Sequence, residues 1–96
     1  MANFDTIQEA HQRIKNLIKK TPILTCETLD KIASENTNER ALFFKCENFQ
    51  KIGAFKYRGA CNAVFKLKDE EAKNGVVTHS SGNHAQALSL AAKKRG

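Results

Sequence analysis

Short runs rich in β-branched and aromatic residues alternate along this chain with segments of helical period. Two such runs are ALFFKCENF at residues 41–49 and GVVTHSS at residues 75–81, and a loop followed by a helical pattern comes after each. A helix between two strands carries the chain back across the sheet, so that the next strand can pair in parallel. The alternation therefore predicts an α/β fold with parallel-type strands.

Four helices are predicted from the 3.6-residue period and from signals at the helix ends. In the first, Thr6 and Glu9 have the spacing of a capping box, and Asp5 is an alternative cap. Pro22 ends this helix, because proline lacks the amide that a helix interior requires. The other three helices are predicted at about residues 28–34, 54–68 and 84–95.

The length and the cysteines restrict the size of the protein and its surroundings. The 96 residues allow one small domain with a modest core. Cys26, Cys46 and Cys61 are odd in number and lack a CxxC spacing, which predicts free thiols in a reducing compartment. No apolar run approaches membrane-spanning length and no signal-peptide pattern opens the chain, so we expect a cytoplasmic protein without membrane contact.

The formal net charge is +6, which raises the question of a nucleic-acid partner. The cations are scattered along the chain, tryptophan is absent and aromatic residues are few. Nucleic-acid binding is therefore not predicted, whereas attraction for small anionic molecules is at least as well supported by the charge.

Lys56, in the stretch KIGAFKYRGA, lies on the same predicted helix face as Ala60, Ala63 and Leu67, and Arg58 lies on the opposite face. This apolar face should point toward the core. One interpretation is a lysine that extends its ammonium group to water. The other is a reactive lysine, because partial burial and a helix N-terminus both favour the neutral amine that attacks an aldehyde. The small alanines would then leave room for a flat ring.

The stretch THSSGNHAQAL places hydrogen-bonding groups between a predicted strand and the last predicted helix. Ser80 and Ser81 carry hydroxyls, Gly82 permits close approach of a ligand, and Asn83 both donates and accepts. Free amides at a helix start can also bind a carboxylate. Plain N-capping by Ser81 or Asn83 is the alternative interpretation.

A metal site is not predicted in this region. His79 and His84 are five residues apart and lack a third ligand. A serine-histidine-acid triad is not predicted either, because no GxSxG pattern is present and Ser81 is too close to His84 in sequence.

Taken in order, FFKCENFQKIGAFKYRGA and VVTHSSGNHAQAL resemble the fold-type II pyridoxal-phosphate enzymes, in particular the serine racemase and threonine/serine dehydratase family. The resemblance extends from about Thr21 to the end of the chain. It implies the N-terminal part of a three-layer αβα fold like that of the tryptophan synthase β subunit. Residues 1–74 would belong to the large domain, and residues 75–96 would form the first strand and helix of the small domain.

The resemblance also implies roles for individual residues. Lys56 would form the Schiff base with pyridoxal phosphate, Phe55 would shape the pocket, and Asn83 would hydrogen-bond the 3′ oxygen of the cofactor. Ser81 would act as acid and base on the substrate face opposite Lys56. The loop that would receive the substrate α-carboxylate consists of Ser80, Ser81, Gly82, Asn83 and His84.

The activity implied is racemisation of L-serine to D-serine, with elimination to pyruvate and ammonia as a side reaction. Ser81 resembles serine racemases and the related 3-hydroxyaspartate dehydratases, whereas many threonine dehydratases carry alanine there, and serine racemase is the favoured choice. Threonine and 3-hydroxyaspartate dehydratases are the alternatives within the family, and a truncated, non-catalytic interaction module is the alternative outside it. A homodimer is expected for the full-length form.

The chain also departs from the family pattern. The resemblance implies a nucleotide contact at Lys51, but Ile52 stands where the family usually has threonine, and Ala54 replaces a serine or threonine. The glycine-rich phosphate cradle and the divalent-metal carboxylates of full-length members have no counterpart in the 96 residues.

Overall fold

The computed structural model describes residues 1–35 and 38–96. In this part of the chain the helices are α1 (Phe4–Ile14), α2 (Glu27–Ser34), α3 (Lys56–Lys66), α4 (Asp69–Ala72) and α5 (Asn83–Arg95), and the strands are β1 (Ile23–Leu24) and β2 (Phe44–Lys45). Two 3-10 turns, η1 (Glu47–Phe49) and η2 (Lys51–Gly53), separate β2 from α3. None of the described helices is both long and apolar enough to cross a membrane.

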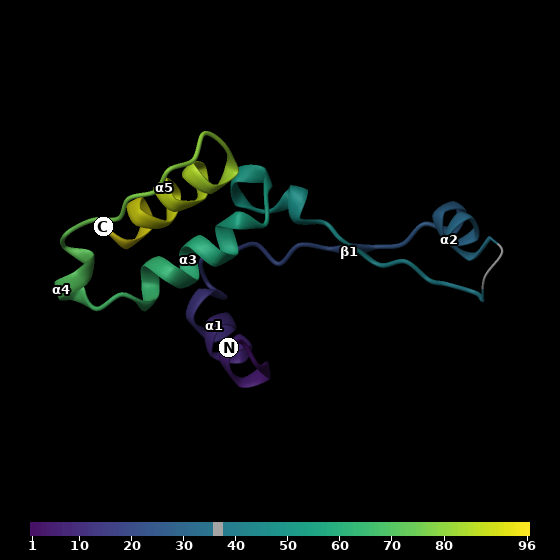
Figure 1. Ribbon diagram of the computed structural model, residues 1–96, viewed down its shortest axis with the longest axis horizontal. Helices are drawn as coiled ribbons and strands as arrows, with labels where there is room; N and C mark the ends of the chain where they lie inside the picture. The colour runs from purple at the N-terminus through teal and green to yellow at the C-terminus, as the bar shows by residue number, and fades with distance from the viewer. Residues whose placement is uncertain (36–37) are drawn as a thin grey trace.

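The core lies between α3 and α5, which run side by side in the same direction (Figure 1). Arg95, at the end of α5, reaches the carbonyl of Val64 near the end of α3, in agreement with this direction. The two helices lie on either side of the boundary predicted after Asn74, and that boundary remains a prediction. The buried core residues are Ile14, Tyr57, Ala60, Cys61, Val64, Ala87 and Ala91.

Helix α1 packs against α3 through Ile14, and Arg13 donates to the side-chain oxygen of Asn62 at 2.6 Å. Its N-cap is Asn3, which forms a capping box with Thr6. The caps predicted at Thr6–Glu9 and Asp5 were therefore wrong, because the helix already begins at Phe4 and the side chain of Asn3 accepts from the amide of Thr6. The helix also ends at Ile14, well before Pro22, in a turn that leads the following residues onto the core.

The predicted strands are only partly formed. Strand β1 pairs with β2 in antiparallel register, with Ile23 opposite Lys45, and this is the only ladder in the described residues. The parallel-type pairing expected from the sequence is thus not formed within residues 1–35 and 38–96. Residues 75–81 lie beside α3 and α5 rather than beside another strand, and a ladder requires a neighbouring strand.

Strands β1 and β2 carry α2 away from the helical body as an arm (Figure 1). The molecule measures 56 × 31 × 23 Å along its principal axes. Helix α2 confirms the helix predicted at residues 28–34, and α3 and α5 confirm the other two, with every end within two residues of its prediction. Asp30 on α2 accepts a hydrogen bond from the amide of Leu42 at 2.7 Å, which joins the two sides of the arm.

Candidate active site

The segment that leads into α3 is held by an ion pair between Glu47 and Arg58. The guanidinium donates Nε to Oε2 and Nη2 to Oε1 of the carboxylate, both at 2.8 Å, and the hydroxyl of Thr21 donates to the same carboxylate. The hydrogen bonds from Arg58 lower the pKa of Glu47 to about 2, and the carboxylate in turn raises the pKa of Arg58. The chain between residues 47 and 58 is therefore closed into a loop by a bidentate charge pair.

Gln50 fixes the middle of this loop. Its buried side chain accepts from the amide of Lys19 at 2.9 Å and donates to the carbonyl of the same residue at 2.8 Å. Its oxygen also accepts from the amide of Lys51 at 3.0 Å. These bonds attach the loop to the chain just before β1.

Ile52 and Gly53 turn the loop sharply toward α3. Both residues have positive φ, 64° at Ile52 and 72° at Gly53. Glycine adopts this conformation readily, but a β-branched isoleucine does so only at a cost in strain. The surrounding hydrogen bonds hold the strained turn in place, including that from the amide of Gly53 to the carbonyl of Gln50 at 2.8 Å.

Lys56 is the first residue of α3, immediately after Phe55 in the N-cap position. Its side chain is exposed, with the ammonium 5.2 Å from the centre of the Phe55 ring, and it makes no ion pair with any described residue. The expectation that Lys56 and Ala63 face the core was wrong, because both are exposed. The buried face of α3 is rotated from the predicted one and consists of Tyr57, Ala60, Cys61 and Val64.

A hollow of about 400 Å³ opens beside the face of α3 that carries Gly59, Ala60 and Ala63. Residues 76–78 and the first part of α5 form its other walls, with His84 at its edge. No atom of another segment lies within 4 Å of where a Cβ on Gly59 would stand. Ala60 and Ala63, which were expected to leave room for a flat ring, thus border this hollow, whereas Lys56 is not among its lining residues.

The loop before α5 is organised by Ser80. Its half-buried hydroxyl accepts hydrogen bonds from the amides of Gly82 at 3.2 Å and Ala85 at 3.3 Å. The N-cap residue of α5 is Gly82, and Ser80, two residues before it, supplies the side-chain oxygen that caps the amide of Ala85; the alternative of capping by Ser81 or Asn83 is therefore wrong. Ser81, Asn83 and His84 are exposed.

The first amides of α5 are available to a ligand. Those of Asn83 and His84 donate to no atom in the described part of the chain. Amides at a helix start favour negatively charged groups. Because α3 and α5 run in the same direction, Lys56 and residues 80–84 are carried at the same end of the helix pair (Figure 1).

Lys51 points into the molecule instead of toward this end. Its ammonium donates to the carbonyl of Leu17 at 2.6 Å and lies 5.8 Å from the centre of the Tyr57 ring. The nucleotide contact expected at Lys51 remains a prediction, and a nucleotide would have to share an ammonium that already binds a carbonyl.

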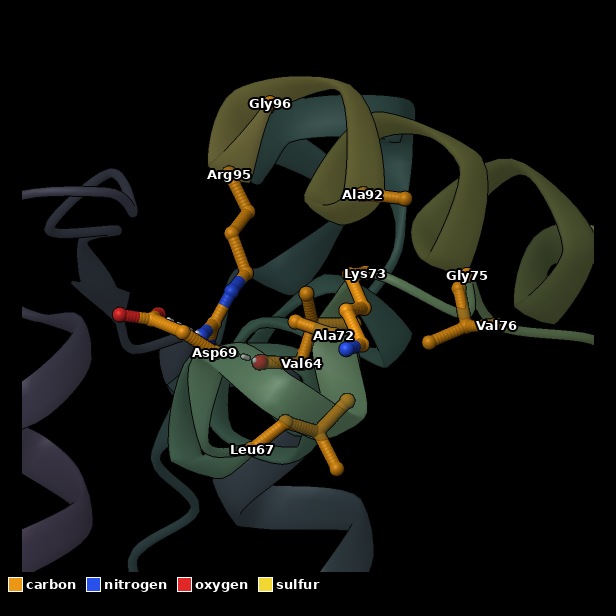
Figure 2. Close-up of a pocket in the computed structure, with 10 residues that line it drawn as sticks. All are labelled: Val64, Leu67, Asp69, Ala72, Lys73, Gly75, Val76, Ala92, Arg95 and Gly96. Atoms are coloured by element: carbon orange, nitrogen blue, oxygen red, sulfur yellow. Dashed lines mark hydrogen bonds and ion pairs between the residues drawn. The ribbon is translucent and has the colours of Figure 1, made fainter.

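Another cavity, of about 420 Å³, lies between α4 and the end of α5 (Figure 2). It contains none of the site residues predicted from the sequence. Arg95 reaches across it to the carbonyl of Val64 at 2.6 Å and to the carboxylate of Asp69 at 3.0 Å, and the stick view shows both contacts. These contacts tie the end of α5 to the end of α3 and the start of α4.

The family profile described as "Pyridoxal-phosphate dependent enzyme" matches residues 14–96. The chain belongs to this family. It is 61% identical to serine racemase of Arabidopsis thaliana over 99% of its length, which is 27% of that protein. It is 54% identical to the β-hydroxyaspartate dehydratase of Paracoccus denitrificans, with 97% of the chain and 28% of that protein covered.

The solved structures agree with this assignment. The structure of maize serine racemase superposes on 98% of the chain with a TM-score of 0.87 at 51% identity, and the match covers 28% of the maize chain. The fold is therefore that of the N-terminal part of a fold-type II enzyme, as the sequence predicted. The chain spans little more than a quarter of the length of these relatives.

The family implies pyridoxal phosphate as the cofactor, and the described residues fit it. An exposed amine begins α3, small residues further along the same helix border a hollow, and free amides begin α5. The residues that sequence reasoning missed are Thr21, Glu47 and Gln50, which position the loop that carries Lys56. Glu47 and Gln50 stand inside the first of the two motifs, but neither the motif nor a periodicity indicates their positioning role, because the partners of these three residues lie 11 to 37 residues away in sequence.

Proposed function

We propose that this chain is the lysine-bearing N-terminal region of a pyridoxal-phosphate-dependent serine racemase that also eliminates water from serine to give pyruvate and ammonia. The observation that carries the proposal is the common position of Lys56 and residues 80–84 at one end of the α3–α5 pair; the small residues of α3 and His84 border a hollow between these segments. The identity to serine racemases from plants supports the choice of substrate.

Lys56 would hold the cofactor covalently and, once released from it, would move the Cα proton of the substrate. Pyridoxal phosphate, when bound, supplies the electron sink that makes this proton removable. The ammonium of Lys56 has no ion-pair partner among the described residues, so its amine is not committed elsewhere. Phe55 would form one wall beside it, and Asn83 would donate to the 3′ oxygen.

The loop at the start of α5 would bind and orient the substrate. The amides of Asn83 and His84 would receive the α-carboxylate, because they have no other acceptor within the described residues and lie at a helix start. The hydroxyl of Ser81 would hold a proton on the face of the substrate opposite Lys56. Return of a proton from Ser81 gives D-serine, whereas loss of the β-hydroxyl gives elimination.

The covalent role of Lys56 is tested with the chain itself. After incubation with pyridoxal phosphate and reduction with borohydride, peptide mapping should place the modification on Lys56, and Lys56→Ala should remove it. Lys66, exposed on the same helix, provides the matched control, and Lys66→Ala should leave labelling unchanged. Labelling spread over the surface lysines, or labelling that survives Lys56→Ala, would contradict the assignment.

The role of Ser81 is tested in a chimera that joins residues 1–96 to the downstream remainder of the Arabidopsis serine racemase. Ser81→Ala should lower racemisation of L-serine by about 10²- to 10⁴-fold, as expected for loss of a positioned acid and base. Elimination should fall less, because it begins with proton removal by Lys56. Racemisation that is undiminished in Ser81→Ala would remove Ser81 from the mechanism.

Ser80→Ala is the matched control in the same loop. It removes the cap of α5 and should cost about 1 kcal/mol of stability, while lowering both activities together. Ser81→Ala should leave stability unchanged, because the hydroxyl of Ser81 makes no hydrogen bond that holds the loop among the described residues. If both variants changed the two activities in the same ratio, the separate chemical role of Ser81 would be wrong.

A 3-hydroxyaspartate dehydratase is the second candidate, because the Paracoccus β-hydroxyaspartate dehydratase is 54% identical to the chain. A chimera that joins residues 1–96 to the downstream segment of the Paracoccus enzyme decides between the substrates. A kcat/KM for L-serine above that for 3-hydroxyaspartate supports the racemase, and the reverse order supports the dehydratase.

We propose four further properties of the full-length protein. They are a homodimeric full-length protein, a cytoplasmic location supported by three free cysteines, a domain boundary after Asn74, and nucleotide and metal binding in a longer chain.

A further inference from the structure

A basic cavity of about 400 Å³ lies outside the proposed active site, where α1, the turn after it, β2 and α3 meet. No acidic side chain lines it. The lining residues are His11, Lys15, Ile18, Lys20, Lys45 and Arg58. At 100° per residue, Arg58 lies about 200° around α3 from Lys56, so the cavity and the reactive lysine are on different faces of the helix.

Two of the cations converge on Thr21. The ammonium of Lys45 donates to the carbonyl of Thr21 at 2.7 Å, and Nη2 of Arg58 lies 3.5 Å from its hydroxyl oxygen. Glu47 is the one carboxylate bound to this pair, and it offsets only one of the two charges. Like charges held this close leave a positive potential that a bound anion would relieve.

Lys15 and Lys20 add two further charges to the lining of the cavity. Both side chains are exposed. The ammonium of Lys15 bonds only to the neutral side chain of Gln12, at 2.6 Å, and Lys20 makes no ion pair with a described residue. The four lysine and arginine charges of the lining, less the one offset by Glu47, leave a net charge of +3.

We propose that this cavity binds a small anion carrying two or more phosphate groups. A net charge of +3 suits a polyanion better than a monoanion. The Nε–Nη2 fork of Arg58 is already used by Glu47, so most of the free donors are lysine ammonium groups, which bind phosphate as point charges. No aromatic side chain lines the cavity, so it lacks the stacking platform typical of single-stranded nucleic-acid sites.

The experiment is calorimetric titration of the 96-residue chain with inorganic pyrophosphate and with tripolyphosphate at a fixed low salt concentration. Lys15→Gln combined with Lys20→Gln should weaken binding about tenfold, the loss expected for two partly screened charges. The matched control is Lys93→Gln combined with Lys94→Gln, which removes the same charge from the exposed end of α5 and should bind as the parent chain does.

Three results would overturn the proposal. Equal weakening in both double variants would show attraction to the overall charge alone. Citrate bound as tightly as pyrophosphate would show no preference for phosphate. A single-stranded oligonucleotide bound more tightly than tripolyphosphate, with loss in the cavity variant, would make the surface a nucleic-acid site.

A measurement on the unchanged chain keeps the test independent of how the variants fold. Pyrophosphate should shift the backbone amide resonances of residues 11–20, 45 and 58 and leave those of residues 80–84 in place. Shifts confined to residues 80–84 would assign the anion to the proposed carboxylate loop and contradict a site in this cavity.

Discussion

Tyr57 is completely buried beneath α5, and its hydroxyl has no hydrogen-bond partner among the described residues. Burial, with a smaller contribution from the neighbouring Cys61, raises the pKa of Tyr57 to about 12. The Cys61 thiol lies near the Tyr57 hydroxyl, but the two groups are not placed to form a hydrogen bond. Burial likewise raises the pKa of Cys61. The ring of Tyr57 stabilises the fold by packing in the core, whereas its unpaired buried oxygen lowers the free energy of unfolding.

Tyr57→Phe should therefore raise the free energy of unfolding by about 1 kcal/mol, because it removes an unpaired buried hydroxyl and keeps the ring. Urea denaturation followed by circular dichroism measures the change. Tyr57→Ala is the control, and it should cost about 3 to 5 kcal/mol through loss of packing. A clear loss of stability in Tyr57→Phe would mean that the hydroxyl has a partner after all.

At the scale of elements, the loop between β2 and α3 depends on the Glu47–Arg58 pair. Glu47→Gln should lower the free energy of unfolding at pH 7 by about 1 to 2 kcal/mol. The loss is not larger because water screens this partly exposed ion pair and limits how much it stabilises the fold. Glu27→Gln is the matched control. Its ion pair with Lys31 is largely exposed, and its loss should change stability by less than about 0.5 kcal/mol.

The pH dependence of this effect has a definite sign. The pKa of Glu47 is lowered from 4.5 to about 2 in the folded chain, so its stabilisation is complete above about pH 4.5 and is lost as the pH falls toward 2. The difference in stability between the parent chain and Glu47→Gln should shrink over that range. A difference that stays constant down to pH 2 would show that the carboxylate is not what holds the loop.

Helices were predictable where local signals suffice, and strands were not. The bounds of α2 and α5 follow from periodicity and turn residues close to their ends. The buried face of α3 was misplaced because it depends on α5, which packs on Tyr57 and Cys61 rather than on Lys56. Residues 75–81 have strand composition but join no ladder, because pairing depends on a neighbour that composition does not specify.

At the scale of the whole molecule, the chain is less compact than its length allows. Its radius of gyration is 17.1 Å, compared with about 13 Å for a compact domain of about 100 residues. The arm formed by β1, β2 and α2 accounts for the length (Figure 1). Apolar side chains exposed along the arm are Ile23, Leu24, Leu29, Ile32, Phe43 and Phe44.

The arm should make the chain associate at high concentration, because exposed apolar surface of this kind favours contact with other apolar surfaces. Ile32→Ser with Phe43→Ser should reduce association while changing the free energy of unfolding by less than about 1 kcal/mol, since these side chains are 62% and 71% exposed. Sedimentation velocity over a range of concentrations measures association. Association unaffected by the double variant would place the contact elsewhere.

The residues of the candidate site could be named from two short motifs, because each motif is contiguous in sequence. Their support could not be named in the same way. Gln50 as the anchor of the loop is a consequence of how segments 31 residues apart meet. Ser80, rather than Ser81 or Asn83, accepts from the amide of Ala85 because of the path of the loop, which the motif does not specify.

The contact between α3 and α5 also determines how far apart the proposed reacting groups lie. Ala87 and Ala91 are fully buried against α3, so two methyl groups fix the spacing of the helix axes. Since Lys56 and residues 80–84 are carried at the same end of these helices, a larger side chain one turn into α5 would widen the opening between them. The distance between Lys56 and residues 80–84 is thus set by buried alanines that would not contact a substrate.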